Sequence, residues 1–474
     1  MPKADFIRLI RRTEARNDDE LSGYLVETSS VKSLLSHENP AYIAIGLKGV
    51  GKSAAFKLLT TAPGADIVRA YNVENLTLSD STKSTNTLNY AREMRFELAV
   101  QAVADLVESA QQNDHIRRKI PADIHQNAIA LVDDLRGKLS EAFSQVGGFS
   151  FFGVGITRRA SSAKKTAPLL EHITQEKYRS ALEIIKSLKG IVSFRFLIDD
   201  PEAIFGFGGT PTIEMVAAIC IAANDLNSSN ENLKTIVTMK PNVFDSLLEV
   251  DEFVSIPVDC RARLSWSYTE LKDVILKRAE VAKCPLNKIF DGNPDEILQR
   301  MAQESRTGPR DLLNRLIVHY QAFPDKAVSM ALLDKTADKY SQLCLEQCTG
   351  PYERSYPGLV RSALVLFQGK DLRMNKKQMR RRFDDMIASD TEIQRHLKEP
   401  WLQVFDKYID KLIDFGLLAV KKGTEIILPY HVDFYDSAKL DGAEYTYIPC
   451  FSPKINFLDQ TTSRSKGPPL SRAR

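Results

Sequence analysis

The chain lacks the features that mark several classes of protein. No stretch approaches the ~18 consecutive apolar residues of a membrane-spanning helix, and charged residues interrupt the N-terminal MPKADFIRLIRRTEARNDDE where a signal peptide has its apolar core. The six cysteines include no CxxC pair, so they favour reduced thiols in a cytoplasmic protein over a disulfide framework. Lys and Arg (64) nearly balance Asp and Glu (61), which argues against a histone-like polyanion binder.

What is present is the composition of a globular protein of several domains. Hydrophobic residues make up 43% of the 474 residues and charged residues 26%, and the length corresponds to about three domains. From Thr269 onward the apolar spacing is mostly helical, whereas short apolar runs that resemble buried strands precede it. We therefore expect an α/β core followed by helices.

A glycine-rich motif stands between a predicted strand and a predicted helix. Residues 46–53, GLKGVGKS, fit the pattern GxxxxGK[ST]; AYIAI precedes them and the helix-compatible SAAFKLL continues them. Glycines let backbone N–H groups surround phosphate oxygens, and a helix N-terminus adds a favourable dipole. We predict that Lys52 neutralises the β- and γ-phosphates and that the Ser53 hydroxyl binds Mg²⁺; the alternative is a glycine-rich structural turn. The predicted nucleotide-binding residues are Gly46, Lys48, Gly49, Val50, Gly51, Lys52, Ser53 and Ala54.

The apolar run FRFLIDD (194–200) ends in two acids, the usual partner of such a loop. Asp199 is the predicted Mg²⁺ ligand, and Asp200 is the predicted catalytic acid that orients water or accepts its proton, with Glu202 as the weaker alternative. Acids at this place also cap helices, and Pro201 fits that interpretation as well. Arg195 inside the run suggests that the strand enters from a partly exposed end.

The next predicted strand, TIVTMKPN (235–242), ends in polar residues where the γ-phosphate is expected. Asn242, or Thr238, is therefore a candidate to orient the attacking water, and a plain turn before Pro241 is the equal alternative. No NKxD-type guanine-binding motif follows this strand, which favours ATP over GTP.

Arginines further along the chain are candidates for contact with the γ-phosphate. Arg310, in TGPRDLL, opens a predicted helix, although an ordinary exposed arginine at a helix start is the alternative. Arg261 and Arg263 are candidates for an arginine that acts across a subunit interface, or else they are solvated strand residues.

The order of these motifs resembles the additional-strand ATPases of the AAA+ and STAND type. GLKGVGKS, FLIDD and TIVTMKPN are followed by LSWSYTELKDVILKRA and SRTGPRDLLNRL, which look like the link to the helical lid and the sensor-2 helix of origin-recognition-type ATPases. More narrowly, the segment from GYLVETSSVKSLL to IGLKGVGKSAAF resembles a bacterial P-loop ATPase family related to KAP and STAND NTPases. The resemblance covers about residues 20–320. It implies a three-layer α/β core with a parallel sheet of strand order 5-1-4-3-2, a helical lid, and ATP and Mg²⁺ as cofactors.

The distance along the chain from Ser53 to Asp199 exceeds that of a minimal core of this type and implies an insertion. The predicted division of the chain is a lead-in (1–35), an ATPase core (36–266, with the insertion at about 75–175), a helical lid (267–350), a winged-helix-like domain (351–440) and an extended or disordered tail (441–474).

Basic residues concentrate near the C-terminus. Residues 361–385 hold eight basic and three acidic residues, and the final fourteen residues carry four basic residues and no acid. Residues 358–440 resemble a winged helix with AVKKGTEIILP as a two-stranded wing. Basic side chains of one predicted helix are candidates for phosphate contacts with nucleic acid, although a solvated face or a protein-interaction module is the alternative. These candidates are Lys376, Lys377, Arg380, Arg381 and Arg382.

The leading hypothesis is a cytoplasmic, Mg²⁺-dependent ATPase that acts as a nucleotide-driven conformational switch, with DNA or a protein as partner and possible homo-oligomers. Family analogy suggests a role in anti-phage defence or DNA maintenance. The alternatives are a nucleotide-gated oligomeric scaffold with little hydrolysis and an origin-recognition-like DNA-binding protein.

Overall fold

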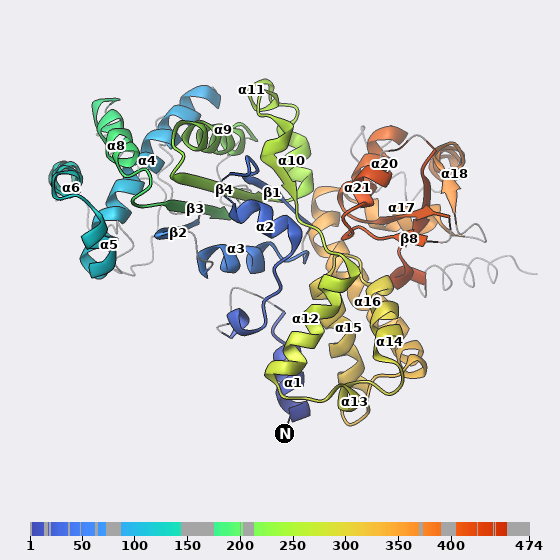
Figure 1. Cartoon of the computed structure of the whole chain (residues 1–474). Coiled ribbons are helices and arrows are strands. Elements are labelled where there is room, and N and C mark those ends of the chain that lie inside the picture. Colours follow the sequence, from blue (N-terminus) through green and yellow to red (C-terminus); the bar gives the residue numbers. More distant parts are fainter. Residues whose placement is uncertain are drawn as a thin grey trace, which may run out of the picture. The chain divides into compact units, whose positions relative to one another are not determined.

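The computed structural model describes most of the chain and divides it into two units (Figure 1). The described residues are 2–13, 18, 20–36, 38–47, 49–61, 65–72, 87–143, 175–199, 201, 213–368, 373–389, 404–423, 425–438, 440 and 442–452. One unit, here the sheet unit, comprises Ser29–Ile45 and Ala55–Arg263; the other, here the helical unit, comprises Met1–Thr28, Gly46–Ala54 and Leu264–Arg474.

A five-stranded parallel sheet organises the sheet unit. Its order is β2-β3-β4-β1-β5, which read from the other edge is the predicted order 5-1-4-3-2. Every residue of β1, β3 and β4 is buried, as expected for central strands of a sheet covered on both faces. The strands are β1 (Ile43–Ile45), β2 (Ile67–Asn72), β3 (Phe194–Asp199), β4 (Leu233–Met239) and β5 (Arg261–Arg263).

Helices lie on both sides of this sheet, so the predicted three-layer α/β core is confirmed. In Figure 1, α9 lies above the strands and α3 below them. Helix α4 packs along α9, and its apolar side chains from Leu98 to Val107 belong to the central core. The helices here are α2 (Ser29–Leu35), α3 (Lys52–Thr61), α4 (Thr87–Gln112), α5 (Asp114–Lys119), α6 (Ala122–Phe143), α8 (Gln175–Ser187), α9 (Ile213–Ser229), α10 (Pro241–Leu247) and α11 (Asp251–Val254), with the short η5 (Val258–Cys260).

The expectation that Arg195 marks a partly exposed strand end is wrong, because its side chain is only 1% exposed. Arg195 pairs in register with Lys234 of β4, which is also buried. Both cations donate to backbone carbonyls at the end of α2 and just beyond it: Arg195 to Leu35 at 3.2 Å, and Lys234 to Ser36 and to Asn39. The negative end of the α2 dipole therefore receives two buried positive charges.

Helices dominate the first part of the helical unit. Helix α1 packs on α12 and α15, and α15 packs on α16. A buried ion pair joins three of these helices: Arg315 Nε donates to Glu304 at 2.6 Å, and Arg315 also donates to Thr336 Oγ1 and to the Leu333 carbonyl. The elements are α1 (Pro2–Ile10), η2 (Leu21–Gly23), α12 (Tyr268–Val281), α13 (Leu286–Ile289), α14 (Pro294–Glu304), α15 (Pro309–Ala322) and α16 (Met330–Ser355).

The C-terminal part of the helical unit combines helices with a four-stranded sheet of order β6-β9-β7-β8. The predicted two-stranded hairpin is present as β7 and β8, and β9 and β6 extend it into a larger sheet that the sequence did not indicate. Residues assigned to the tail form β9, whose Tyr445 is buried and donates to the Ala438 carbonyl at 2.8 Å. The elements are α17 (Leu359–Leu366), β6 (Met374–Asn375), α18 (Lys376–Ser389), α20 (Phe405–Asp414), β7 (Leu418–Lys422), β8 (Glu425–Ile427), α21 (Phe434–Ala438), β9 (Glu444–Tyr447) and η7 (Pro449–Phe451).

Several expectations fall on residues outside the described part, among them residues 73–86 and 144–174 of the insertion and residues 453–474 of the tail. All six cysteines are buried free thiols. Among the described residues, no helix is long and apolar enough to span a membrane.

Candidate functional site

The glycine-rich motif has the predicted strand–loop–helix context. Gly46 directly follows β1, and α3 begins at Lys52. Gly49 and Gly51 have φ angles of 99° and 102°, a backbone region that side chains other than hydrogen disfavour. The loop therefore needs glycine at position 49 as well, although the GxxxxGK[ST] pattern allows any residue there.

The candidate phosphate-binding lysine lies against its own loop. The Lys52 side chain is 8% exposed, and its amine donates to the Gly46 carbonyl at 2.9 Å and the Leu47 carbonyl at 3.4 Å. Ser53 and Ala54, the next two residues of α3, are half-buried. Lys48 lies outside the described residues.

The candidate Mg²⁺ ligand ends the central strand β3 of the sheet unit. Asp199 is 5% exposed, and its Oδ1 accepts a hydrogen bond of 2.5 Å from Thr238 Oγ1 of β4. The two residues are partners in register, and Thr238 in turn pairs with Ala44 of β1, one residue before the strand ends at Ile45. All three strands run in parallel, so these groups share the carboxyl edge of the sheet, where ligands bind in open α/β folds.

The remaining candidates of this edge are described only in part. Asp200 and Glu202 lie outside the described residues, so their catalytic roles stay predictions. Asn242 is the second residue of α10, and nothing is described of its side chain. Of the two alternatives, Thr238 is the one with a described contact at this edge, its hydrogen bond to Asp199.

The segment Thr307–Asp311 packs on the glycine-rich loop. A Cβ atom placed on Gly49 would lie 2.6 Å from Thr307 Oγ1 and 3.4 Å from Arg310 Cβ. Asp311 fixes this turn, since its Oδ2 accepts from the backbone N–H groups of Arg306 and Thr307 and from the Thr307 hydroxyl at 2.8–3.1 Å. Two predicted residues far apart in sequence, Gly49 and Arg310, thus lie side by side.

The arginine of β5 is held inside the sheet unit. Arg261 Nη2 donates to the Ile256 carbonyl at 3.0 Å, and its guanidinium lies 5.2 Å from the Phe244 ring centroid and 5.8 Å from that of Phe253. These contacts favour a structural role for Arg261, while Arg263 on the same edge strand is half-buried.

The basic candidates of α18 fall into two kinds. Lys376, Lys377, Arg380 and Arg381 are exposed, whereas Arg382 is half-buried and donates to the Leu366 and Gln368 carbonyls at 3.1 and 3.0 Å. The opposite side of α18 buries Met379, Phe383 and Met386. Sequence spacing did not separate Arg382 from its neighbours, because the carbonyls that bind it come from another helix.

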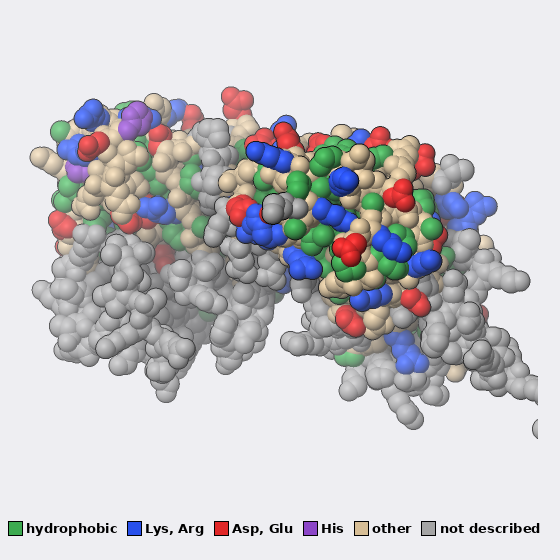
Figure 2. Space-filling view, turned by 90° about the horizontal axis from the view of Figure 1, so that it is seen from below, with side chains coloured by type: hydrophobic (Ala, Val, Ile, Leu, Met, Phe, Trp, Pro, Cys, Tyr) green, Lys and Arg blue, Asp and Glu red, His purple; other side chains and the backbone are tan. Residues whose placement is uncertain are grey.

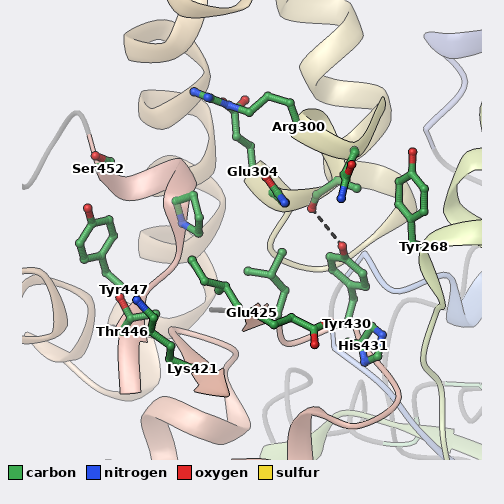
Figure 3. A pocket seen from close by; sticks show the side chains of 16 residues that line it. Tyr268, Arg300, Glu304, Lys421, Glu425, Tyr430, His431, Thr446, Tyr447 and Ser452 are labelled. Carbon is green, nitrogen blue, oxygen red and sulfur yellow. Dashed lines mark hydrogen bonds and ion pairs between the residues drawn. The ribbon is translucent and has the colours of Figure 1, made fainter. Parts of the chain in front are cut away.

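The helical unit also contains a cavity of about 720 Å³, between α14 and strands β7–β9 (Figure 3). Tyr268, Arg300, Tyr430 and Tyr447 are among the side chains that line it. The Tyr430 hydroxyl points to the last turn of α14 and donates to the Ala302 carbonyl at 3.0 Å. Burial raises the pKa of Tyr430 above its ordinary value, so its hydroxyl remains a donor in basic solution as well as at neutral pH.

Charge is mixed on the face of the molecule seen in Figure 2. Lys and Arg side chains alternate there with Asp, Glu and apolar side chains over the described part of the surface. Among the described residues of this face, no large area carries a single sign of charge.

Trp266 contacts the candidate loop, although no sequence motif predicted that contact. Its indole N–H donates to the Val50 carbonyl at 2.6 Å. The signal available in the sequence was a buried-type aromatic residue in the otherwise polar segment SWSYTE, just before a helix with a capping box at Ser267 and Glu270. Nothing in the sequence indicated its partner.

Comparisons with known proteins found no matching family model and no matching curated protein. Among solved structures, the chain is similar to Cdc6p from Pyrobaculum aerophilum (10% identity, 96% of this chain and 98% of that chain covered, TM-score 0.34). It is also similar to the Aeropyrum pernix ORC2 protein in its ADPNP-ADP complexes (11%, 92% and 93%, TM-score 0.35) and to Drosophila ORC bound to DNA (10%, 95% and 91%, TM-score 0.33).

Proposed function

We propose that the chain binds ATP together with Mg²⁺ at the loop 46–53 and hydrolyses it to drive a conformational switch. The observation that carries this proposal is the loop, in which two glycines with positive φ precede Lys52 at the start of a helix. Backbone N–H groups and a helix N-terminus favour phosphate at such a place. The Lys52 ammonium adds the positive charge that β- and γ-phosphates require.

The donors available for a divalent cation fit Mg²⁺. The Ser53 hydroxyl and the Asp199 carboxylate are oxygen ligands, which Mg²⁺ prefers, and Mg²⁺ commonly binds one or two carboxylates together with phosphates. Bound there, the metal would neutralise charge on the phosphates. Thr238 would hold the Asp199 carboxylate in place through the hydrogen bond they share.

Hydrolysis is assigned to Asp200, which would orient water or accept its proton, with Asn242 or Thr238 assisting. Arg310 would contact the γ-phosphate, because its Cβ lies beside the loop at Gly49. Loss of that phosphate would release α15, which begins at Pro309, and change the packing of the helices after it.

Calorimetric titration with ATP and measurement of phosphate release test this proposal. We expect Lys52→Ala to weaken ATP binding at least tenfold, which corresponds to about 1.4 kcal/mol, and Lys57→Ala on the same helix to leave it unchanged. Asp200→Asn should retain binding and lose turnover. A wild-type chain that fails to bind ATP would refute the proposal. Binding and ATP-driven assembly without turnover, measured by mass photometry, would favour the oligomeric scaffold instead.

A second candidate function, DNA contact through a winged-helix-like C-terminal domain, is favoured by the exposed basic face of α18. Non-specific DNA binding should weaken as salt rises, and Arg380→Ala or Arg381→Ala should each reduce the slope of log K against log salt by about 1. Lys288→Ala, an exposed lysine of α13, is the matched control. Unchanged slopes would exclude this face. A role in anti-phage defence or DNA maintenance stays a prediction from family analogy.

A further inference from the structure

Trp266 lies in the segment that joins β5 to α12, and its side chain is 7% exposed. One edge of its indole contacts the glycine-rich loop. Its Nε1–H donates to the Val50 carbonyl at 2.6 Å, and a Cβ atom placed on Gly51 would lie 3.4 Å from Trp266 Cζ2. The indole thus contacts both residues that form the Val50–Gly51 peptide.

Other contacts fix Trp266 itself. Its backbone N–H donates to the Tyr430 carbonyl at 2.8 Å, and the Tyr430 hydroxyl is held by the Ala302 carbonyl of α14 (Figure 3). Gly308 lies close to the same edge of the indole, since a Cβ atom there would lie 3.3 Å from Trp266 Cδ1 and 3.4 Å from Tyr430 Cβ. A backbone hydrogen bond and close packing thus both hold Trp266 beside the loop.

The hydrogen bond to Val50 sets the direction of a neighbouring donor. In a planar trans peptide the C=O and N–H groups point to opposite sides. Because Trp266 holds the Val50 carbonyl on its own side, the Gly51 N–H of the same peptide points away from the indole. A reversed peptide would direct a carbonyl oxygen where the N–H now points, and that oxygen would repel phosphate.

We propose that Trp266 is a positioning residue of the phosphate-binding loop: it fixes the Val50–Gly51 peptide so that the Gly51 N–H is available to a nucleotide phosphate. This inference rests on the proposed function. Phenylalanine would keep an aromatic side chain here but has no N–H to donate, so Trp266→Phe removes the hydrogen bond to Val50.

The experiment uses the full chain with Trp401→Phe, which leaves Trp266 as the single tryptophan. Calorimetry measures the affinity for ATP independently of fluorescence, and the emission of Trp266 is followed in a parallel titration. We expect W401F to bind ATP as the wild type does, with a shift in emission that saturates at the calorimetric affinity. Trp266→Phe should weaken ATP binding about fivefold to tenfold, as loss of one hydrogen bond does. Lys52→Ala in the W401F chain should abolish the shift.

The outcomes separate the inference from the proposed function. ATP binding by calorimetry with unchanged Trp266 emission and unchanged affinity in W266F would overturn the inference and leave the function standing. Absence of calorimetric binding in the wild type would overturn both. If W266F does not fold, 5-fluorotryptophan incorporated into the W401F chain gives a single ¹⁹F resonance. A shift of that resonance with ATP, absent in the Lys52→Ala variant, supports the inference, and an unshifted resonance in a chain that binds ATP refutes it.

Discussion

Gly49→Ala tests the most demanding contact of the glycine-rich loop. Alanine at a φ of 99° is strained, and left-handed backbone costs a non-glycine residue about 1–2 kcal/mol. The new Cβ would also lie 2.6 Å from Thr307 Oγ1, a distance that requires movement. Thr307 cannot yield without loss, because its hydroxyl donates to Asp311 at 3.0 Å, and a hydrogen bond to a charged group contributes about 1.5–3 kcal/mol.

The contacts give the expected magnitudes. Taking the strain as about 1.5 and the lost hydrogen bond as about 2, Gly49→Ala should destabilise the helical unit by about 3.5 kcal/mol, and Thr307→Ala alone by about 2 kcal/mol. In the double variant the clash is gone, since the Thr307 Cβ lies 3.5 Å from the new Cβ atom. The hydrogen bond is then lost only once. We therefore expect about 3.5 kcal/mol for the double variant and a coupling free energy of about −2 kcal/mol.

Equilibrium urea unfolding, followed by the emission of Trp266 in the W401F chain, measures these values. This probe reports locally, because Trp266 contacts both Val50 and Gly51. Singles that add to the double within about 0.5 kcal/mol would contradict the close approach of Gly49 to Thr307. A Gly49→Ala variant as stable as the wild type would contradict the positive φ as well.

Three further predictions concern buried or half-buried cations. Burial, with the Arg195 charge as the smaller cause, lowers the pKa of Lys234 to about 8. Between about pH 8 and 10, Lys234 is therefore deprotonated in the folded chain and still protonated in the unfolded chain. The free energy of unfolding should rise by about 1–2 kcal/mol across that pH range in the wild type, and Lys234→Met should lack this rise. Arg315→Ala should lower the free energy of unfolding by about 3–5 kcal/mol in urea titrations, because it leaves Glu304 buried without this partner. Arg300 pairs with the same carboxylate but is 43% exposed, so Arg300→Ala should lower it by only about 0–1 kcal/mol. Arg382→Ala should lower the melting temperature in scanning calorimetry, since two carbonyls lose their donor.

Much of the parallel sheet could be predicted because its strands are apolar runs that are followed by glycine, proline or polar residues. FRFLID and LKTIVTM are buried at every position; β3 ends in Asp199, and Thr238 is the last residue but one of β4. Arg195 and Lys234 were misjudged or overlooked for a physical reason. Hydropathy takes a charge as exposed, whereas here both cations find backbone carbonyls of α2 and the turn after it.

The C-terminal sheet was predicted only in part because its strands come from distant segments. β7 and β8 form a hairpin with Gly423 at a positive φ, which is a local signal. β9 pairs with β7 from beyond α21, and nothing local distinguishes EYTY from an extended tail. The burial of its two middle residues, Tyr445 and Thr446, depends on the pairing with β7.

In the candidate site too, local features could be predicted from the sequence and contacts with distant segments could not. A motif identified the loop, since phosphate binding requires specific residue types at fixed spacing. The contacts that give the loop its shape come from elsewhere, with Trp266 separated from Val50 by 216 positions. Glycine at position 49 likewise depends on Thr307, whose place is fixed by Asp311.

The conformation of the loop therefore depends on distant segments of the helical unit as much as on its own glycines. Trp266 holds the Val50 carbonyl, Thr307 packs against Gly49, and Leu47 lies where a Cβ atom on Gly416 would reach, at 2.8 Å. Each contact comes from a different segment of this unit, so a rearrangement of the loop by phosphate would act on all three at once. Movement of these segments of the helical unit would in turn alter the loop, because energetic coupling between two parts of a protein is reciprocal.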